Sequence, residues 1–367
     1  MAQLGDFVRA KALVRSASRA FGPKETMARA RCAVAEAEIA LASRDLHWPQ
    51  KALDAARVTL QEHGDTTNAA LARYLEIRRL LLIGRVDAAE ELLQDLNFAA
   101  MPPALRAAHE LIVAGIAMRR VDSKTARAAL TRAARAAHDA RIPALSAEVE
   151  NASHLLNTPA ARLIRRGEAR PLLLDEVETV LASKSLVVDA CRHVVRHGRS
   201  AISLATRPVL FTLVRALAEA WPEDVPRGAL VTRAFRAKLA DESHRARLRV
   251  EMGRLRSQLR TIANVSATER GFSLQPKTAR DVMVLARPVE EEYASVLALL
   301  ADGESWSSSA LALGLGASQR TVQRALDSLA ETGKVQSFGR GRARRWMTPP
   351  VPGFATTLLL PAPLPSD

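Results

Sequence analysis

From residue 24 to residue 165 the apolar positions recur every three or four residues, and Gly or Pro interrupts the pattern only at intervals. This spacing predicts a series of amphipathic helices. Residues 84–90 and 119–124 look alike, because each begins a helix, and Val86 and Val121 lie 35 residues apart. A period of this length is typical of stacked helical hairpins, each of which buries one face on its neighbour. The alternative is a helical bundle without repeats.

Residues 25–165 resemble tetratricopeptide repeats, although Ala and Leu fill most of the positions at which that family carries aromatic residues. The resemblance implies a surface that binds peptides, partner proteins or a second copy of the chain. We therefore expect residues 1–165 to form a helical, repeat-like domain. We also expect a protein partner or self-association through residues 25–165, with a homo-oligomer as the result.

Short β-type runs replace the helical pattern after Pro159. Residues 186–188 and 201–204 have strand character, Pro208 stands in the first turn of a helix, and a second helix follows Pro226. A third helix is predicted over about 243–262, and residues 265–274 return to strand character. The apolar positions of this third helix are spaced four and three residues apart and predict one buried stripe. They are Leu248, Met252, Leu255, Leu259 and Ile262.

The opposite face of this third helix combines small side chains with arginines. The small positions are Ala246, Val250, Gly253 and Ser257, with Arg249, Arg256 and Arg260 along one side and Arg247 and Arg254 along the other. Such a helix can enter the major groove of DNA, where guanidinium groups reach phosphates or the acceptor atoms of guanine. The alternative is a solvated face that pairs with Asp241, Glu242 and Glu251, but these acids are too few to neutralise the arginines.

The same residues carry a family resemblance. The segment Leu248-x-Val250-x-Met252-x-x-Leu255-Arg256-x-Gln258-Leu259, followed by Thr268-x-Arg270-Gly271-Phe272-x-Leu274, resembles the OmpR-like winged helix of response regulators over about 186–276. The resemblance implies that the third helix is a recognition helix and that Arg270 lies in the wing hairpin. We expect this domain to span residues 172–285. The first 165 residues do not resemble a phosphoacceptor domain, so the resemblance does not extend to control by aspartyl phosphorylation.

A second pattern of helices follows. Residues 289–300 predict an amphipathic helix, Ser307 caps a short helix that ends at residues 314–316, and Ser318 opens a third helix. The turn 339–341 then joins two strands into a basic hairpin. The order resembles the small winged helices of bacterial repressors, over 289–348 within an expected domain of 286–348. The alternative is an uncommitted three-helix domain. The candidate DNA contacts are Arg320, Thr321, Gln323, Arg324, Lys334, Arg340, Arg342, Arg344 and Arg345.

Charge supports a polyanionic partner. The 367 residues carry a formal charge of +14, and residues 171–285 alone hold 19 basic and 12 acidic side chains.

Residues 349–367 contain six prolines and are expected to be a disordered tail. Two distant cysteines exclude a disulfide-rich secreted domain, and the apolar runs are too short to cross a membrane. Residues 1–22 also fit a transit peptide, but a first helix of a cytosolic protein is the favoured interpretation.

Signals for catalysis are weak. The sequence holds no phosphate-binding loop, and Gly314-Leu315-Gly316 is better explained as a turn. Cys191, His193 and His197 have the spacing of metal ligands, but on a strand hairpin they would not face one point. We therefore expect no enzymatic activity, no cofactor and no metal.

Together these patterns predict a mainly α protein in which a helical-hairpin array precedes two winged-helix domains. The expected function is a sequence-specific regulator of transcription that binds double-stranded DNA, without a membrane partner, in the cytoplasm and on the nucleoid. One alternative is a tetratricopeptide-type adaptor that uses its winged helices for protein contacts. The other is a sequence-neutral nucleic-acid-binding protein.

Overall fold

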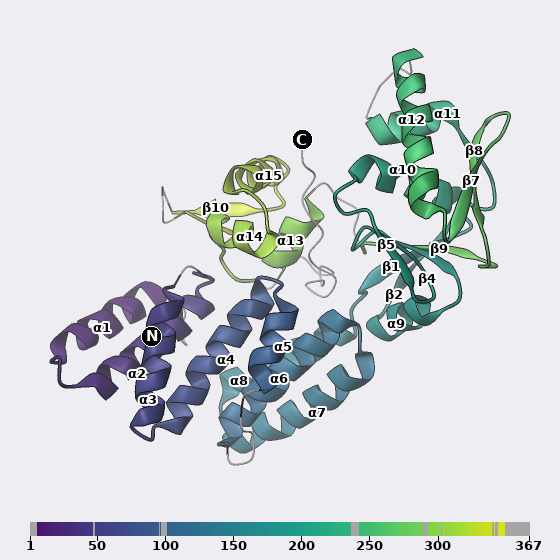
Figure 1. The fold of residues 1–367 in the computed structure, drawn as a ribbon. Helices are drawn as coiled ribbons and strands as arrows, with labels where there is room; N and C mark the ends of the chain where they lie inside the picture. Colours follow the sequence, from purple (N-terminus) through teal and green to yellow (C-terminus); the bar gives the residue numbers. More distant parts are fainter. Residues whose placement is uncertain are drawn as a thin grey trace. The chain divides into compact units, whose positions relative to one another are not determined.

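A computed structural model of the chain is mainly helical, with small sheets (Figure 1). It describes residues 6–46, 48–94, 96, 101–235, 242–288, 293–301, 303–339, 341 and 344–348. These residues form two compact units. One combines the residues up to 157 with those from 295 onward, and the other comprises residues 158–294.

Eight helices form the first part of the chain, and each packs against the next (Figure 1). They are α1 (Phe7–Ala20), α2 (Thr26–Ala42), α3 (Gln50–Glu62), α4 (Thr66–Leu82), α5 (Val86–Gln94), α6 (Pro103–Arg120), α7 (Ser123–Ala140) and α8 (Pro143–Leu156). The even-numbered helices also contact one another in series, from α2 to α8. The array buries many alanines, such as Ala126, Ala129 and Ala133 on α7, because small side chains let neighbouring helices approach closely.

Polar contacts in this array repeat along the chain. Lys11 pairs with Asp45 at 2.9 Å, and Arg31 pairs with Asp65 at 2.7 Å, and both pairs join residues 34 positions apart. Asp65 also accepts a hydrogen bond from the backbone N–H of Asn68 and so caps α4. Contacts at a constant separation are what a stack of similar hairpins produces.

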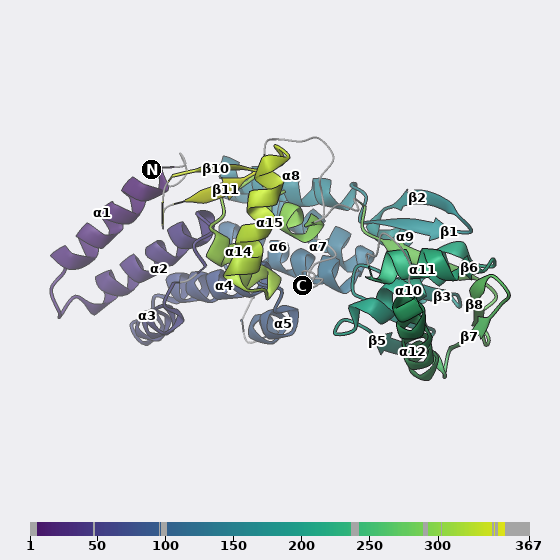
Figure 2. The ribbon, with the colours of Figure 1, turned by 90° about the horizontal axis from the view of Figure 1, so that it is seen from above.

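The C-terminal residues add a small helical module to the same unit. It contains α13 (Ala294–Leu300), α14 (Ser308–Leu315), α15 (Gln319–Glu331) and the antiparallel strands β10 (Gln336–Phe338) and β11 (Arg345–Met347), as Figure 2 shows. Trp306 and Trp346 exchange two backbone hydrogen bonds of 2.8 Å, which places a short third strand segment beside the hairpin. Both indole rings are fully buried.

This module packs on the array. The guanidinium of Arg44, which follows α2, lies 5.8 Å from the centre of the Trp306 ring. Gly314 of α14 approaches the carbonyl oxygen of Leu82 at the end of α4, and a Cβ at that glycine would lie 3.5 Å from this oxygen. Every residue of α13 from Ser295 to Leu300 is buried. The contacts of Arg44 and Leu82 with the module thus come from Trp306 and from Gly314 of α14.

The second unit begins with a sheet. Its strand order is β2 (Glu168–Leu172), β1 (Ala161–Arg165), β9 (Val282–Ala286), β3 (Leu186–Asp189), β4 (Val194–His197) and β5 (Ser200–Ser203). All neighbours are antiparallel except β3 and β9, which pair in parallel. The helix α9 (Leu174–Ala182) connects β2 to β3.

Three helices and a smaller sheet complete this unit. The chain continues through α10 (Pro208–Ala220), β6 (Val225–Pro226), α11 (Arg227–Phe235), α12 (Glu242–Leu259), β7 (Ala263–Ala267) and β8 (Gly271–Pro276). The smaller sheet has the order β6-β8-β7 and is antiparallel. One apolar core joins the two sheets to α10, α11 and α12. The helices and strands predicted between 186 and 274 are thus present, with α12 ending three residues earlier than expected.

The boundary expected at residue 165 differs from the structure. The helices of the array end at Leu156, and residues 161–165 form β1, which pairs with β2 and β9 of the second unit. The apolar spacing of Ala161, Leu163 and Ile164 fits both a helix and a short strand, and only the distant strand β9 decides between them.

Substitution of two glycines of this unit by alanine is expected to have opposite effects on its stability. A Cβ at Gly271 would lie 1.8 Å from the carbonyl oxygen of Val225, whereas a Cβ at Gly253 on α12 would meet no atom within 4 Å. We expect Gly271→Ala to destabilise the unit by about 1–3 kcal/mol or more, because β6 and β8 must separate. Gly253→Ala should stabilise it by about 0.5–1 kcal/mol, because alanine favours the helix. Urea unfolding of the two full-length variants measures both effects, and equal signs would contradict the close packing of β8 on β6.

Candidate nucleic-acid interface

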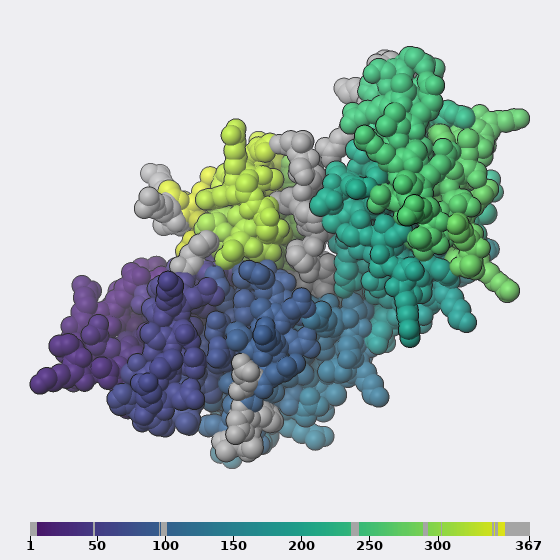
Figure 3. All heavy atoms as spheres, viewed as in Figure 1, coloured from purple at the N-terminus to yellow at the C-terminus, as the bar shows by residue number. Residues whose placement is uncertain are grey.

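The helix α12 has one buried and one exposed face. Leu248, Met252, Leu255 and Leu259 are buried in the core of the second unit. On the opposite face the Val250 side chain is 55% exposed, and the small residues beside it are exposed as well. The helix lies on the surface of its unit, as the space-filling view shows (Figure 3). The predicted division of this helix into a packing stripe and a free ridge is confirmed.

The arginines beside this ridge are all exposed, but they differ in their partners. Arg249 pairs with Glu242 at 2.9 Å, and Arg254 pairs with Glu251 at 2.9 Å. Arg247 lies over the ring of Phe235, 4.6 Å from its centre. An exposed ion pair such as that of Arg249 with Glu242 contributes roughly 0–1 kcal/mol, so a phosphate group can replace this carboxylate at little cost.

Arg256 contacts the hairpin β7–β8. Its Nε donates a hydrogen bond of 2.6 Å to the carbonyl oxygen of Val265, and its guanidinium lies 5.6 Å from the ring centre of Phe272. Arg227 approaches the same ring at 5.5 Å and donates to the carbonyl oxygens of Thr268 and Glu269. Arg256 therefore has a structural role in holding the hairpin against α12, in addition to the phosphate contact expected from the sequence.

The turn of this hairpin carries Arg270. Its side chain is 76% exposed and lies 4.0 Å from Asp224. Thr268 holds the turn, because its hydroxyl donates to Asp224 and accepts from the backbone N–H of Gly271. Arg270 therefore stands on a tightly bonded turn and not on a loose loop.

In the C-terminal module α15 repeats the division seen on α12. Val322, Leu326 and Leu329 are buried, whereas Arg320 and Arg324 are exposed. Ser318 caps the helix by accepting from the N–H of Thr321, and the two hydroxyl groups lie 2.7 Å apart. The hydroxyl of Thr321, expected to contact bases, thus takes part in the cap.

Two of the remaining polar candidates of this module, Gln323 and Arg344, have side-chain partners on the protein. Gln323 donates to Asp327 at 2.9 Å. Arg344 donates to Ser337, lies 4.0 Å from Asp327 and stacks over the Trp346 ring at 4.2 Å, while Lys334 and Arg345 are half-buried. Arg340 and Arg342 lie outside the described residues.

No family model, curated protein or solved structure matches the chain. Within the described ranges no three His, Cys, Asp or Glu side chains gather at a position that could hold a metal ion. In the same part of the chain no helix has both the length and the apolar character needed to cross a membrane.

Sequence reasoning overlooked two arginines of the second unit. Arg207 is the N-cap residue of α10, but its side chain makes no capping hydrogen bond. Arg227 holds the β7–β8 hairpin through its bonds to backbone carbonyls. The signal at Arg207 was its position directly before Pro208, because helices usually begin with a side chain that accepts hydrogen bonds. Arg227 carried no comparable signal, because its partners are backbone carbonyls 41 and 42 residues away.

A half-buried histidine stands directly before β4 and packs against α10. His193 stacks on Phe211 with ring centres 4.4 Å apart, and its Nδ1 is buried. Burial lowers the pKa of His193 below its ordinary value, and the charges of Arg287 and Arg215 lower it further, against the opposing effect of Asp189. The backbone of His193 has a φ of +54°, in the left-handed region.

We expect the second unit to lose stability as the pH falls below about 6.5. The folded state keeps His193 neutral while the unfolded chain takes up a proton, so the contribution is complete above the ordinary pKa and decreases below it. His193→Asn removes the proton site and suits the left-handed backbone. Urea unfolding from pH 7.5 to 5 should show a weaker pH dependence for this variant, with His154→Asn on the exposed face of α8 as the control. Equal dependence in both variants would contradict the assignment.

Proposed function

We propose that the protein is a sequence-specific regulator of transcription that binds double-stranded DNA through two winged helices. The observation that carries the proposal is the outer face of α12, where small exposed residues form a ridge between two rows of arginines. Small side chains allow a helix to approach the base edges, and guanidinium groups at both sides reach the phosphates of the two strands. The wing tip with Arg270 adds a contact of the same kind.

The order of elements in the two modules supports the proposal. In the second unit the order is helix α10, strand β6, helices α11 and α12, then β7 and β8, with the first strand paired to the last. The C-terminal module repeats it with α13, the segment at Trp306, α14, α15, β10 and β11, and Trp306 again pairs with the last strand. This is the order expected for a helix-turn-helix followed by a wing. The OmpR-like assignment of the first module rests on the residues of α12 and of the β7–β8 hairpin, and the preceding strands β3, β4 and β5 also suit it.

The array of α1 to α8 is proposed as the domain that receives a signal or sets the oligomeric state. Its repeated contacts at a separation of 34 residues support the tetratricopeptide-like interpretation. Stacked hairpins of this kind present extended surfaces to peptides and partner proteins. A homo-oligomer would double the DNA site.

Selection of duplexes from a random library with the full-length protein tests the proposal. At physiological salt we expect the selected duplex to bind at least about 1,000-fold more tightly than a scrambled duplex, as measured by fluorescence anisotropy. Arg320→Ala and Arg324→Ala should change the selected sequence, because these side chains lie at the exposed start of α15. Equal affinity for both duplexes would show a sequence-neutral binder, and no affinity for either would favour the adaptor.

Arg260→Ala tests the phosphate contacts separately. Arg260 is exposed at the end of α12 beside the ridge. Its loss should weaken binding to selected and scrambled duplexes alike and reduce the slope of log affinity against log salt by about one. Arg57→Ala on α3, where the arginine pairs with Asp54, is the control and should leave the slope unchanged. An unchanged slope in Arg260→Ala would remove this residue from the interface.

A further inference from the structure

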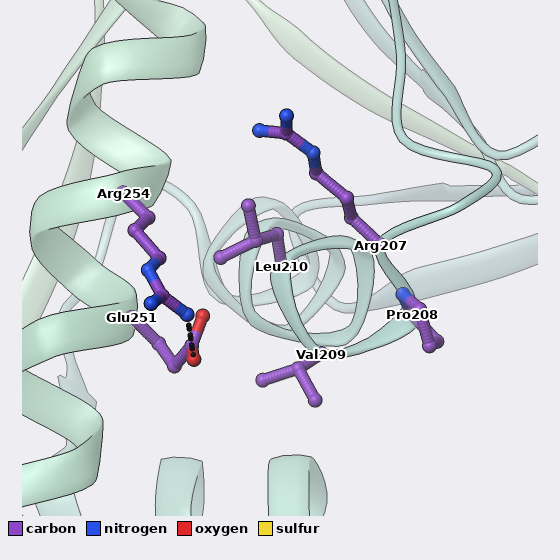
Figure 4. Close-up of a pocket in the computed structure, with 6 residues that line it drawn as sticks. All are labelled: Arg207, Pro208, Val209, Leu210, Glu251 and Arg254. Atoms are coloured by element: carbon purple, nitrogen blue, oxygen red, sulfur yellow. Dashed lines mark hydrogen bonds and ion pairs between the residues drawn. The ribbon is translucent and has the colours of Figure 1, made fainter.

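A cavity of about 420 Å³ lies between the first turn of α10 and the middle of α12 (Figure 4). Its size falls within the range of sites that bind small molecules. The residues that line it are Arg207, Pro208, Val209, Leu210, Glu251 and Arg254. All of them belong to the second unit. Glu251 and Arg254 lie on α12 outside its buried stripe, and Leu210 of α10 packs in the same core as that stripe.

The lining combines an apolar surface with an excess of positive charge. Pro208, Val209 and Leu210 supply the apolar part, and Leu210 lies between the two arginine side chains (Figure 4). Glu251 pairs with Arg254 at 2.9 Å, which leaves one guanidinium without a carboxylate. The side chain of Arg207 has no hydrogen-bond or ion-pair partner among the residues that the structure describes.

We propose that this cavity binds a small organic acid that joins an anionic group to an apolar body. The anionic group would accept hydrogen bonds from Arg207 and Arg254, and the apolar body would cover Val209 and Leu210. Guanidinium groups form strong, charge-assisted hydrogen bonds with carboxylates. A bare inorganic anion would leave the apolar wall in water, and a neutral ligand would leave Arg207 without a partner.

The site is coupled to DNA through Arg254, and this step rests on the proposed function. Arg254 belongs to the rows of arginines beside the ridge of α12, and its side chain is 64% exposed. A bound acid draws Arg254 away from the DNA phosphates and adds negative charge beside the recognition helix. Ligand binding therefore lowers the affinity for DNA.

Three related probes, each of which changes one feature of the ligand, test the ligand class on the full-length protein. They are 4-phenylbutanoate, the uncharged 4-phenylbutanol, and butanoate, which lacks the aromatic body. We expect 4-phenylbutanoate to shift the amide resonances of Val209 and Leu210 and to bind at least about tenfold more tightly than either of the other two. Arg207→Ala should weaken its binding about tenfold. Arg233→Ala, which removes an exposed arginine paired with Glu219 outside the cavity, should bind it as the wild type does.

Equal binding of the acid and the alcohol, unchanged binding in Arg207→Ala, or the absence of binding would overturn the assignment. A further test adds a DNA duplex to the protein that has bound 4-phenylbutanoate and follows the amide resonances of Val209 and Leu210. If the duplex displaces the acid in Arg254→Ala as well as in the wild type, a DNA phosphate fills the cavity, and the assignment is overturned. At a concentration of 4-phenylbutanoate that just saturates the wild type, the selected duplex should bind at least about threefold more weakly, and at the same concentration the effect in Arg207→Ala should be smaller. An acid that binds while the duplex affinity stays constant would overturn the coupling. If the proposed function is wrong, no duplex binds at all. The amide shifts of Val209 and Leu210 still measure binding of the acid in that case, because they do not require DNA.

Discussion

The buried stripe of α12 is the interaction on which the rest of the interface depends. Leu248, Met252, Leu255 and Leu259 occupy one side of the helix and are fully enclosed by α10, α11 and the small sheet. A helix fixed along one side must present its other side to solvent. Burial of four large side chains, each contributing about 1.5–3 kcal/mol, therefore determines where every arginine of the helix lies. The proposed contacts with DNA follow from packing and not from the arginines themselves.

The protein uses its arginines in two different ways. Arg227 and Arg256 approach the same ring of Phe272 and donate to backbone carbonyls, so they stabilise the wing. Arg249 and Arg254 are themselves exposed and pair instead with carboxylates on their own helix, and the fully exposed pair of Arg249 with Glu242 exchanges readily. The first group gives the interface its shape, and the second keeps charge available for a polyanion or a small acid.

The sequence predicted α10, α12, α14 and α15 because each carries a local signal, whereas it did not predict β1, β2, α9 and β9. The stripe on α12 follows helical spacing, Pro208 opens α10, and Ser307 and Ser318 cap α14 and α15 through hydrogen bonds that the structure contains. The end of the array was placed too late, at residue 165, because the pairing of β1 depends on β9, more than a hundred residues away. Arg227, which anchors the β7–β8 hairpin, was missed for the same reason, because its partners are backbone carbonyls of a distant turn. The cavity beside Arg207 was missed because it forms only where α10 and α12 meet.

The division of the chain into two units gives the array a more direct connection to α15 than to α12. The C-terminal module packs on the array through the contact of Arg44 with Trp306 and through the approach of Gly314 to Leu82. The helix α12 belongs to the other unit, which the chain enters after residue 157 and leaves before residue 295. Under the proposed function, a protein that binds the array would therefore act on α15 through residues that already touch, because Trp306 and α14 contact the array. An acid in the proposed site would act on α12 through Arg254. Under the proposed function the two DNA-binding helices thus respond to different inputs, and a bipartite DNA site would combine them.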